Sequence, residues 1–227
     1  MASVSPTVLS ATGVGKSVPG GRQLFAGLAL VVAPGEVVAI MGESGVGKST
    51  LLNLVAGLDT ADTGRIVIAG HDLASLDDDA RTLLRRDHIG FVFQAFHILP
   101  HLTLAQNIAL PLVLARTPTA AALPRATAML ARVGLDGRGN DFPAQLSGGE
   151  MQRIAIARAL VHAPSLILAD EPTGNLDPET AERVLALFIA ETRGSGAGAI
   201  IVTHSDRAAA IADRVLVLGA GGLAPRR

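Results

Sequence analysis

The chain contains no cysteine, no tryptophan and no tyrosine, and only two of its 227 residues are lysines, Lys16 and Lys48. Without cysteine it can form neither a disulfide framework nor a thiolate metal site, which fits a reducing cytosol. The formal net charge of −1 provides no basic excess, so we expect no nucleic-acid partner. The length suggests a single domain or one domain with a subdomain, and 49% hydrophobic residues suffice for a large core.

Charge is also absent from Phe91–Ala115, a stretch long enough to suggest a membrane span. It contains histidine, glutamine and asparagine side chains and is interrupted by Pro100 and Pro111. A lipid-spanning helix would have to bury all of these polar groups, so we reject a span and expect a soluble chain.

The first residues, MASVSPTVLSATG, have neither a charged region nor a long apolar core, so we expect no signal peptide.

The pentapeptide GVGKS occurs twice, at Gly13–Ser17 and at Gly45–Ser49. A phosphate-binding P-loop requires the longer pattern Gly-x-x-x-x-Gly-Lys-Ser/Thr between a buried strand and a helix. The second copy meets this requirement, because Gly42–Ser49 follows the apolar run Glu36–Met41 and precedes a run of helix formers. The second copy therefore predicts a nucleotide site.

The first copy lacks both features of a P-loop. Ser10 stands where the leading glycine should be, and Pro19 with two glycines follows almost directly. These residues stop a helix before its first turn, so no row of free N–H groups faces a phosphate. We therefore interpret Gly13–Ser17 as strand and turn.

In the second copy, each residue type has a chemical reason. The glycines let successive N–H groups converge on phosphate oxygens, Lys48 supplies a charge to the β- and γ-phosphates, and the Ser49 hydroxyl ligates Mg²⁺. The expected nucleotide-binding residues of this loop are Gly42, Glu43, Ser44, Gly45, Val46, Gly47, Lys48, Ser49 and Thr50.

Two adjacent acids, Asp170 and Glu171, end the apolar run in LILADEPTGNLD. Such acids are costly at the end of a buried strand unless a positive group faces them. In P-loop NTPases an aspartate at this place holds Mg²⁺, and Glu171 could then take a proton from an attacking water. A little further on, Asp177 and Pro178 are typical of an N-cap and a first helical residue.

A second anion site is indicated by LSGGEMQRIAIARAL, which we call the signature segment. Ser147 and Glu150 fit a capping box, and capping alone would explain these two residues. It does not explain Gly148 and Gly149, which weaken a first helical turn. Two glycines permit close approach of a ligand to exposed N–H groups, so we interpret this helix start as a phosphate site.

Apolar runs alternate with helical patterns along most of the chain, which predicts an α/β protein with a largely parallel sheet. The expected strands are Leu28–Val32, Glu36–Met41, Arg65–Ala69, Ile89–Phe93, Ser165–Ala169, Ala199–Thr203 and Arg214–Leu218. The expected helices are Ser49–Ala56, Asp77–Asp87, Thr103–Ala115, Ala120–Val133, Gly149–Val161, Pro178–Glu191 and Asp206–Ala212. The block from about 96 to 146 contains only helical patterns, so we expect an inserted α-helical subdomain there.

The predicted fold class is thus a P-loop NTPase core with an N-terminal antiparallel β region and that helical insertion. We expect one domain over residues 1–227, in which 1–95 and 147–227 form the α/β core.

Five motifs, GESGVGKST, Gln94, the signature segment, LILADEPTGNLD and IIVTHSD, follow one another in this order. Together they resemble the ATP-binding subunit of ABC transporters, and the resemblance covers essentially the whole chain. The signature segment is highly specific, whereas a P-loop alone is not. In that family two subunits face head to tail, with each ATP between one P-loop and the partner's signature. The resemblance therefore implies ATP and Mg²⁺ as cofactors and a second copy of the chain as a partner.

The resemblance also implies residue roles. Gln94 contacts Mg²⁺ and water and links to a membrane subunit, and His204 contacts the γ-phosphate and positions water. Ser147–Gly149 bind the γ-phosphate in trans, and Asp177 makes a contact across the dimer. The implied catalytic residues are Glu171, His204 and Gln94, and the implied metal ligands are Ser49, Gln94 and Asp170. An integral membrane permease subunit would hold the chain peripherally at the cytoplasmic face of the inner membrane.

Within the family, GESGVGKSTLLNLVAGLD, GFVFQAFHILPHLTLAQNIALPL and ADEPTGNLD look most like the lipoprotein-release, macrolide-export and cell-division group. The predicted function is ATP hydrolysis that drives a membrane partner in lipoprotein release or export. A nucleotide-gated regulator of a cell-wall enzyme complex is the alternative, and the sequence does not separate the two. A DNA or cohesin-like motor would need a long coiled-coil insertion, and a translation-type protein would need two cassettes.

Two local features depart from or extend this resemblance. The family usually stacks adenine on an aromatic residue, but the corresponding region here reads Lys16-Ser-Val18. We therefore expect weak selection of the base unless Phe25 or the membrane partner contributes.

Just after Gln94, the residues Phe96, Ile98 and Leu99 precede Pro100 in an expected surface loop. They form either an exposed docking patch for the membrane subunit or part of the subdomain core.

Overall fold

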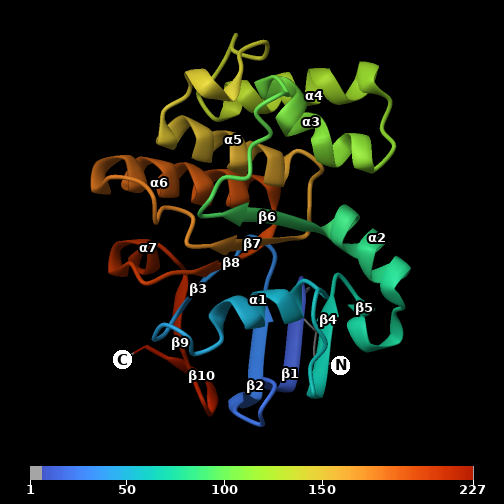
Figure 1. Cartoon of the computed structure of the whole chain (residues 1–227), viewed down its shortest axis with the longest axis vertical. Coiled ribbons are helices and arrows are strands. Elements are labelled where there is room, and N and C mark those ends of the chain that lie inside the picture. Colours follow the sequence, from blue (N-terminus) through green and yellow to red (C-terminus); the bar gives the residue numbers. More distant parts are fainter. Residues whose placement is uncertain (1–6, 227) are drawn as a thin grey trace, which may run out of the picture.

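The computed structural model describes residues 7–226. Residues 1–6, which belong to the segment where we expect no signal peptide, lie outside this range. Figure 1 shows three layers, with helices at one end, a sheet through the middle and a second sheet at the other end. These two sheets carry all the strands assigned in the described range.

The smaller sheet is antiparallel and has the strand order β2-β1-β4-β5. Its strands are β1 (Leu9–Ser17), β2 (Gln23–Val32), β4 (Thr63–Ile68) and β5 (His71–Asp72). The first GVGKS copy forms the end of β1, where the register shifts, and the chain then turns at Val18–Gly21. The interpretation of Gly13–Ser17 as strand and turn is confirmed.

The larger sheet has the order β10-β9-β3-β8-β7-β6, and only β10 runs antiparallel to its neighbour. Its strands are β3 (Val37–Met41), β6 (Ile89–Phe93), β7 (Leu166–Asp170), β8 (Gly198–Val202), β9 (Arg214–Gly219) and β10 (Gly222–Pro225). Because β3 and β7 end at the same edge, the loops that follow them meet there.

Alternation along the strands of the larger sheet divides the interior into two cores. In β7, Leu166 and Leu168 face the core shared with the antiparallel sheet, while Ile167 and Ala169 face the core shared with the helices. Successive side chains of a strand point to opposite faces, and here both faces are covered. This is why these strands read as continuous apolar runs in the sequence.

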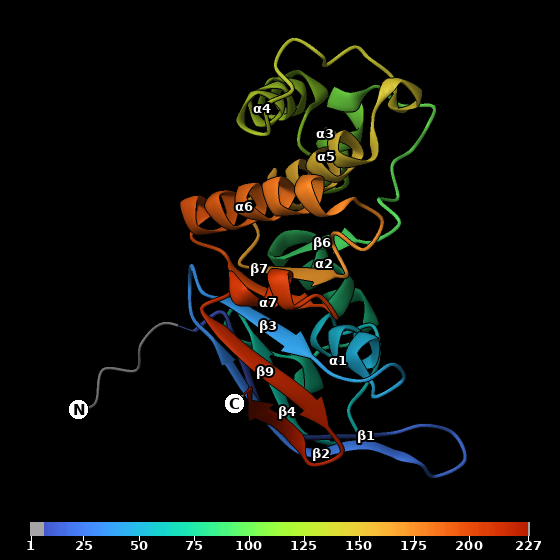
Figure 2. The same cartoon turned by 90° about the vertical axis from the view of Figure 1, so that its left-hand side faces the viewer.

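Helices α3, α4, α5 and α6 gather on one side of the larger sheet, whereas α1 lies on the other side beside the antiparallel sheet (Figure 2). The helices are α1 (Lys48–Val55), α2 (Asp78–His88), α3 (Leu104–Leu114), α4 (Thr119–Arg132), α5 (Gly148–Leu160), α6 (Pro178–Ser195) and α7 (Asp206–Ala210), with 3₁₀ turns η1 (Leu73–Ser75) and η2 (Pro143–Gln145). The uncharged stretch Phe91–Ala115 divides into the end of β6, a loop and α3. Within residues 7–226, no helix combines the length and the apolar character needed to cross a bilayer.

The predicted fold class is confirmed, including the antiparallel N-terminal region and the helical insertion. Four strand assignments differ from the sequence prediction. The strand β2 begins at Gln23, five residues before the predicted start at Leu28. The strand β1 begins at Leu9, before the duplicated pentapeptide, and β5 and β10 were not predicted. The strand β5 has only two residues and β10 lies at a sheet edge with proline at its end, so neither carries a clear alternating pattern.

Candidate nucleotide site

The loop Gly42–Gly47 connects β3 to α1 at the edge of the larger sheet. Gly47 is the N-cap of α1 and has φ 111°, which glycine adopts without steric cost. A Cβ at this position would lie 3.3 Å from the side chains of Leu24 and Phe25. The loop therefore needs glycine both for its conformation and for its close approach to β2.

The Lys48 side chain folds back over this loop. Its ammonium donates to the backbone oxygens of Gly42 (2.8 Å) and Glu43 (3.0 Å) and lies 3.1 Å from His204 Nε2. Lys48 is only 8% exposed, and burial lowers its pKa, although Glu171 and Asp170 oppose this shift. The only buried lysine of the described chain is thus held between backbone oxygens of the P-loop and two nearby carboxylates.

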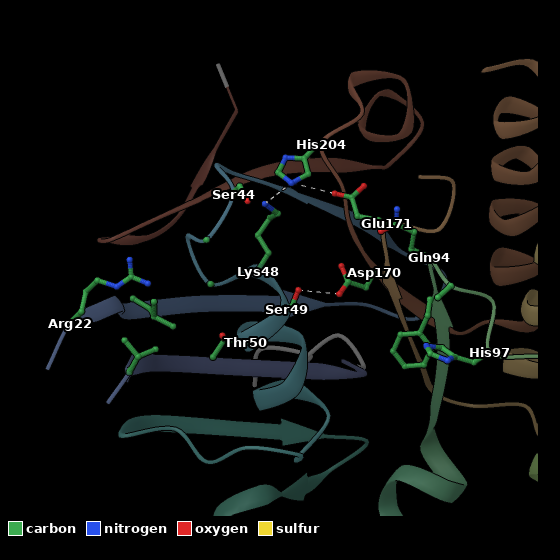
Figure 3. A pocket seen from close by; sticks show the side chains of 16 residues that line it. Arg22, Ser44, Lys48, Ser49, Thr50, Gln94, His97, Asp170, Glu171 and His204 are labelled. Atoms are coloured by element: carbon green, nitrogen blue, oxygen red, sulfur yellow. Dashed lines mark hydrogen bonds and ion pairs between the residues drawn. The ribbon is translucent and has the colours of Figure 1, made fainter. Parts of the chain in front are cut away.

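Ser49 and Asp170 join the P-loop to the end of β7. The Ser49 hydroxyl donates to Asp170 Oδ2 at 3.0 Å, as the dashed line in Figure 3 shows. Two of the three predicted metal ligands are therefore brought together from positions far apart in the sequence. Among residues 7–226, no group of three or more histidine or acidic side chains could hold a metal ion by itself.

Glu171 follows β7 with a left-handed backbone, φ 46°, which is unusual for a residue other than glycine. Its Oε1 lies 3.5 Å from His204 Nε2, and its Oε2 accepts a hydrogen bond from Thr203. In Figure 3 the His204 ring lies between Lys48 and Glu171. Two of the three predicted catalytic residues, Glu171 and His204, thus lie next to each other and next to the P-loop lysine.

Gln94 follows β6 and pairs reciprocally with Asn175, a residue that sequence reasoning missed. Gln94 Nε2 donates to Asn175 Oδ1 at 3.0 Å, and Asn175 Nδ2 donates to the Gln94 backbone oxygen at 2.9 Å. A Cβ at Gly174 would lie 2.8 Å from Gln94 Nε2, so this glycine makes room for the glutamine. The pair ties Gln94 to the turn before α6.

A cavity of about 520 Å³ holds the side chains of Lys48, Ser49, Gln94, Asp170 and Glu171 together with His204. Its outer end is lined by Val18, Arg22 and Leu24 from the β1–β2 hairpin. Sequence analysis placed Val18 in the region that corresponds to the adenine contact, but it did not predict Arg22, Leu24 or His97, which also lines the cavity. Val18, Arg22 and Leu24 share proximity to the turn at Gly20 and Gly21, which is too weak a signal to identify a ligand contact, and the sequence around His97 gives no signal. Phe25 is fully buried in the core and does not line the cavity.

The start of the signature segment lies outside this cavity. Ser147 and Gly149 line a separate hollow of about 510 Å³ between α4, α5 and α6. Ser147 caps α5 by accepting from the Glu150 N–H, and Glu150 accepts from the Ser147 N–H at 2.8 Å, which confirms the capping box. One chain therefore does not bring its own signature residues to its own P-loop.

The two signature glycines have different surroundings. A Cβ on Gly149 would clash with the Thr180 methyl group of α6, whereas one on Gly148 would lie 3.3 Å from the tip of Leu176. Gly149 is buried and Gly148 is partly exposed. Gly149 thus has a packing reason that the sequence interpretation, based on ligand approach alone, did not include.

Asp177 confirms its predicted capping role. Its carboxylate accepts from the Thr180 N–H at 3.0 Å, and this hydrogen bond lowers the Asp177 pKa. Pro178 is the first residue of α6, as predicted. The Asp177 side chain is solvent-exposed at the start of α6, close in sequence to Asn175.

This arrangement defines a P-loop nucleoside triphosphatase. A glycine loop at a helix N-terminus, a buried lysine, a serine–aspartate pair and an adjacent carboxylate are the groups that phosphoryl transfer to water requires. The family model described as ABC transporter matches residues 25–174, and the chain belongs to this family. It is the ATP-binding and ATP-hydrolysing subunit of an ABC transporter.

Several curated proteins are similar over almost the full chain. The lipoprotein-releasing system ATP-binding protein LolD of Novosphingobium aromaticivorans is 49% identical over 87% of this chain and 88% of its own length. The LolD protein of Pseudomonas fluorescens is 48% identical over 95% and 96%. The macrolide export ATP-binding/permease protein MacB of Shigella flexneri is 47% identical, but the match covers 91% of this chain and 32% of that protein.

Solved structures give the same family. The ATP-binding cassette MJ0796, in a dimeric post-hydrolysis state with ADP and Pi, matches with a TM-score of 0.81 and 37% identity. The match covers 95% of this chain and 96% of that one. The predicted family resemblance, the fold class and the ATPase activity are therefore confirmed.

Proposed function

We propose that this ATPase drives lipoprotein release through an integral membrane partner. Relatives named as parts of lipoprotein-releasing systems match at 48–49% identity over nearly their whole length. The macrolide exporter matches over only 32% of its length. The chain docks on its membrane partner at the cytoplasmic face of the inner membrane and remains peripheral to the bilayer.

The cavity residues fit Mg²⁺ together with ATP. Ser49 Oγ and Asp170 Oδ2 lie 3.0 Å apart and present hard oxygen ligands, which Mg²⁺ prefers alongside substrate phosphates and water. When bound, Mg²⁺ would neutralise charge on the β- and γ-phosphates. Gln94 completes this set once its hydrogen bond to Asn175 is exchanged for a contact in the cavity.

Protein groups divide the remaining work. Gly42–Thr50 cradle the phosphates, and Lys48 moves its ammonium from backbone oxygens to phosphate oxygens. Glu171 accepts a proton from the attacking water, and His204 holds that water and the γ-phosphate in place. The distance of 3.5 Å between Glu171 Oε1 and His204 Nε2 supports a shared task for these two residues.

We further propose that the working site is composite, and the observation that carries this part is the separation of the two helix ends expected to bind phosphate. The P-loop faces one cavity, and Ser147 with Gly149 faces another. A complete site then needs the P-loop of one copy and the signature residues of a second copy. We assign Asp177 to the contact with the partner subunit, as the family resemblance implies, and its exposed position at the start of α6 leaves it free to make that contact.

Mixing two inactive variants tests this arrangement. Lys48→Ala removes the P-loop charge, and Ser147→Arg blocks the signature end of α5. Each homodimer then lacks two functional sites, but a mixed dimer has one intact site, built from the P-loop of the Ser147→Arg copy and the signature of the Lys48→Ala copy. ATPase activity of the mixture should reach up to about one quarter of the wild-type value, because half the dimers are mixed and carry one of two sites.

The control is a mixture of Lys48→Ala with a Lys48→Ala,Ser147→Arg double variant, which contains no intact P-loop and should stay inactive. An inactive mixture of the two single variants, both folded and able to dimerise, contradicts the composite site. Activity of isolated Ser147→Arg at the wild-type level contradicts it equally.

A further inference from the structure

Thr203 is a buried residue directly after β8. It contacts Glu171 and precedes His204 in the sequence, but it lies outside the nucleotide cavity. It is 1% exposed and does not line that cavity. Its hydroxyl donates to Glu171 Oε2 at 3.2 Å and accepts from the Ser205 N–H at 3.0 Å. Its backbone N–H donates to Ile40 O at 3.1 Å, which fixes it to β3.

The direction of this hydrogen-bond chain follows from the donors available. A backbone N–H can only donate, so Ser205 occupies an acceptor lone pair of the Thr203 oxygen. An ionised carboxylate can only accept, so the hydroxyl proton of Thr203 points to Glu171. The chain therefore runs from Ser205 through Thr203 to the Glu171 carboxylate.

His204 does not supply a second donor in this state. The Lys48 ammonium has three protons, and its three partners are the oxygens of Gly42 and Glu43 and Nε2 of His204. His204 Nε2 then accepts and carries no proton toward Glu171. In agreement, Glu171 Oε1 is buried without a hydrogen-bond partner in the described structure. Within residues 7–226, Thr203 is thus the only side chain that donates a hydrogen bond to this carboxylate.

We propose that Thr203 is a positioning residue that aims the Glu171 carboxylate for catalysis. This inference rests on the proposed role of Glu171 as the base. A carboxylate on a flexible stem occupies several rotamers, and one charge-assisted hydrogen bond from a buried, rigid threonine selects one of them. Because Thr203 does not line the cavity, it acts on the chemical step and not on nucleotide binding.

The test uses variants of the full chain that separate the hydroxyl from the shape of the side chain. Thr203→Val removes the hydroxyl and nearly keeps the shape, whereas Thr203→Ser keeps the hydroxyl. Thr203→Val should lower kcat about tenfold to hundredfold, the effect of losing one hydrogen bond to a charged group. The Kd for ATP should stay within about twofold, and Thr203→Ser should recover most of the lost kcat.

Thr192 provides a matched control. It is also fully buried, on α6, and its hydroxyl has no hydrogen-bond partner in the described structure. Thr192→Val should leave kcat unchanged, which excludes a general effect of removing a buried hydroxyl.

A double-mutant comparison assigns the effect to Glu171. In a Glu171→Gln background, Thr203→Val should change single-turnover hydrolysis by less than about threefold, because the group that Thr203 aims is no longer a base. Turnover near normal in Glu171→Gln alone would remove the proposed base. If Glu171→Gln is inactive while Thr203→Val is normal or faster, the base remains and only the role of Thr203 fails.

A loss of ATP binding equal to the loss of kcat also overturns the inference, because it indicates a general distortion of the site. If Thr203→Val does not fold, Thr203→Ser is compared with Thr203→Ala, since both lose the methyl group and differ only in the hydroxyl. Equal kcat for these two variants contradicts the positioning role.

Discussion

At the residue scale, the two lysines show how neighbours decide what a shared pentapeptide does. Lys16 donates to Asp59 Oδ1 and to the Thr60 backbone oxygen, both at 2.8 Å, and so ties β1 to the loop after α1. The hydrogen bond from Lys16 lowers the Asp59 pKa. Lys48 has no such carboxylate within hydrogen-bond distance and faces the cavity. The same five residues therefore serve as a structural strand end in one place and as a phosphate loop in the other.

Lys48→Ala should abolish ATP hydrolysis, because it removes the charge that meets the phosphates. Lys16→Ala should leave hydrolysis largely intact and cost about 1 kcal/mol of stability, as expected for an ion pair whose acidic partner remains exposed to solvent. Steady-state ATPase assays and denaturant unfolding measure both effects. Loss of hydrolysis in both variants, with both folded, contradicts the assignment of one P-loop.

The outer end of the cavity bears on selection of the base. Phe25 is buried, and the residues that reach this end are Val18, Arg22 and Leu24, none of which presents an aromatic ring. Competition binding should therefore give ATP and GTP affinities within about tenfold of each other, since aromatic stacking worth about 1–3 kcal/mol is missing. A large preference for ATP would indicate that another group recognises adenine.

Arg22 offers a finer measurement at the same place. Its guanidinium lies at the outer end of the cavity in Figure 3 and can stack on either purine. Arg22→Ala should weaken ATP and GTP binding by a similar factor and leave inorganic triphosphate binding unchanged. Equal weakening of triphosphate binding would place Arg22 on the phosphates and not on the base.

At the element scale, the packing of α5 on α6 depends on a missing side chain. The Thr180 methyl group occupies the space that a Cβ on Gly149 would need. Gly149→Ala should therefore lower the free energy of unfolding by about 1–3 kcal/mol, the usual cost of overpacking. Gly194→Ala on α6 is the control, because the new Cβ would meet only the end of Arg132. This substitution should stabilise the protein by about 0.4–1 kcal/mol. Thermal unfolding measures both variants. If Gly149→Ala is as stable as the unchanged chain, α5 and α6 can move apart without loss of stability and the packing argument fails.

Elements with strong periodicity were predictable and short edge elements were not. The caps at Thr103, Ser147 and Asp177 mark their helices clearly, because each side chain satisfies a free N–H group that a helix start must leave. By contrast, β5 and β10 derive their conformation from a neighbouring strand. The Gln94–Asn175 pair and the Thr203–Glu171 contact join separate loops, so no local pattern could indicate them.

The predicted patch after Gln94 is only partly exposed. Leu99 is 45% exposed, whereas Ile98 packs against the helical core and Phe96 is half-buried. Arg158 donates to the backbone oxygens of Phe96 (2.8 Å) and His97 (2.6 Å) and holds this segment against α5. The proposed docking surface therefore consists of Leu99 from this segment and not of all three side chains.

At the scale of the whole molecule, Leu99 lies in the helical layer, next to Asn107 of α3. The Asn107 side chain accepts from the Leu99 N–H at 2.8 Å and donates to the Leu99 oxygen at 3.0 Å, which ties the backbone of this loop to α3. Leu99→Asp should leave folding and basal ATPase activity intact but abolish copurification with the membrane partner. The matched control is Phe142→Asp, at an exposed apolar residue (47%) before η2, which should still copurify. Assembly unaffected by Leu99→Asp contradicts docking at this loop.

The placement of the P-loop and the signature segment in two separate cavities has a consequence for dilute solutions. A site that requires two chains makes the specific activity of the free subunit rise with its concentration, since hydrolysis follows an encounter. Two subunits tethered to one membrane assembly meet at an effective concentration in the millimolar range, whatever their number in the cell. Free copies would then consume little ATP, and assembly itself would set where the nucleotide is consumed.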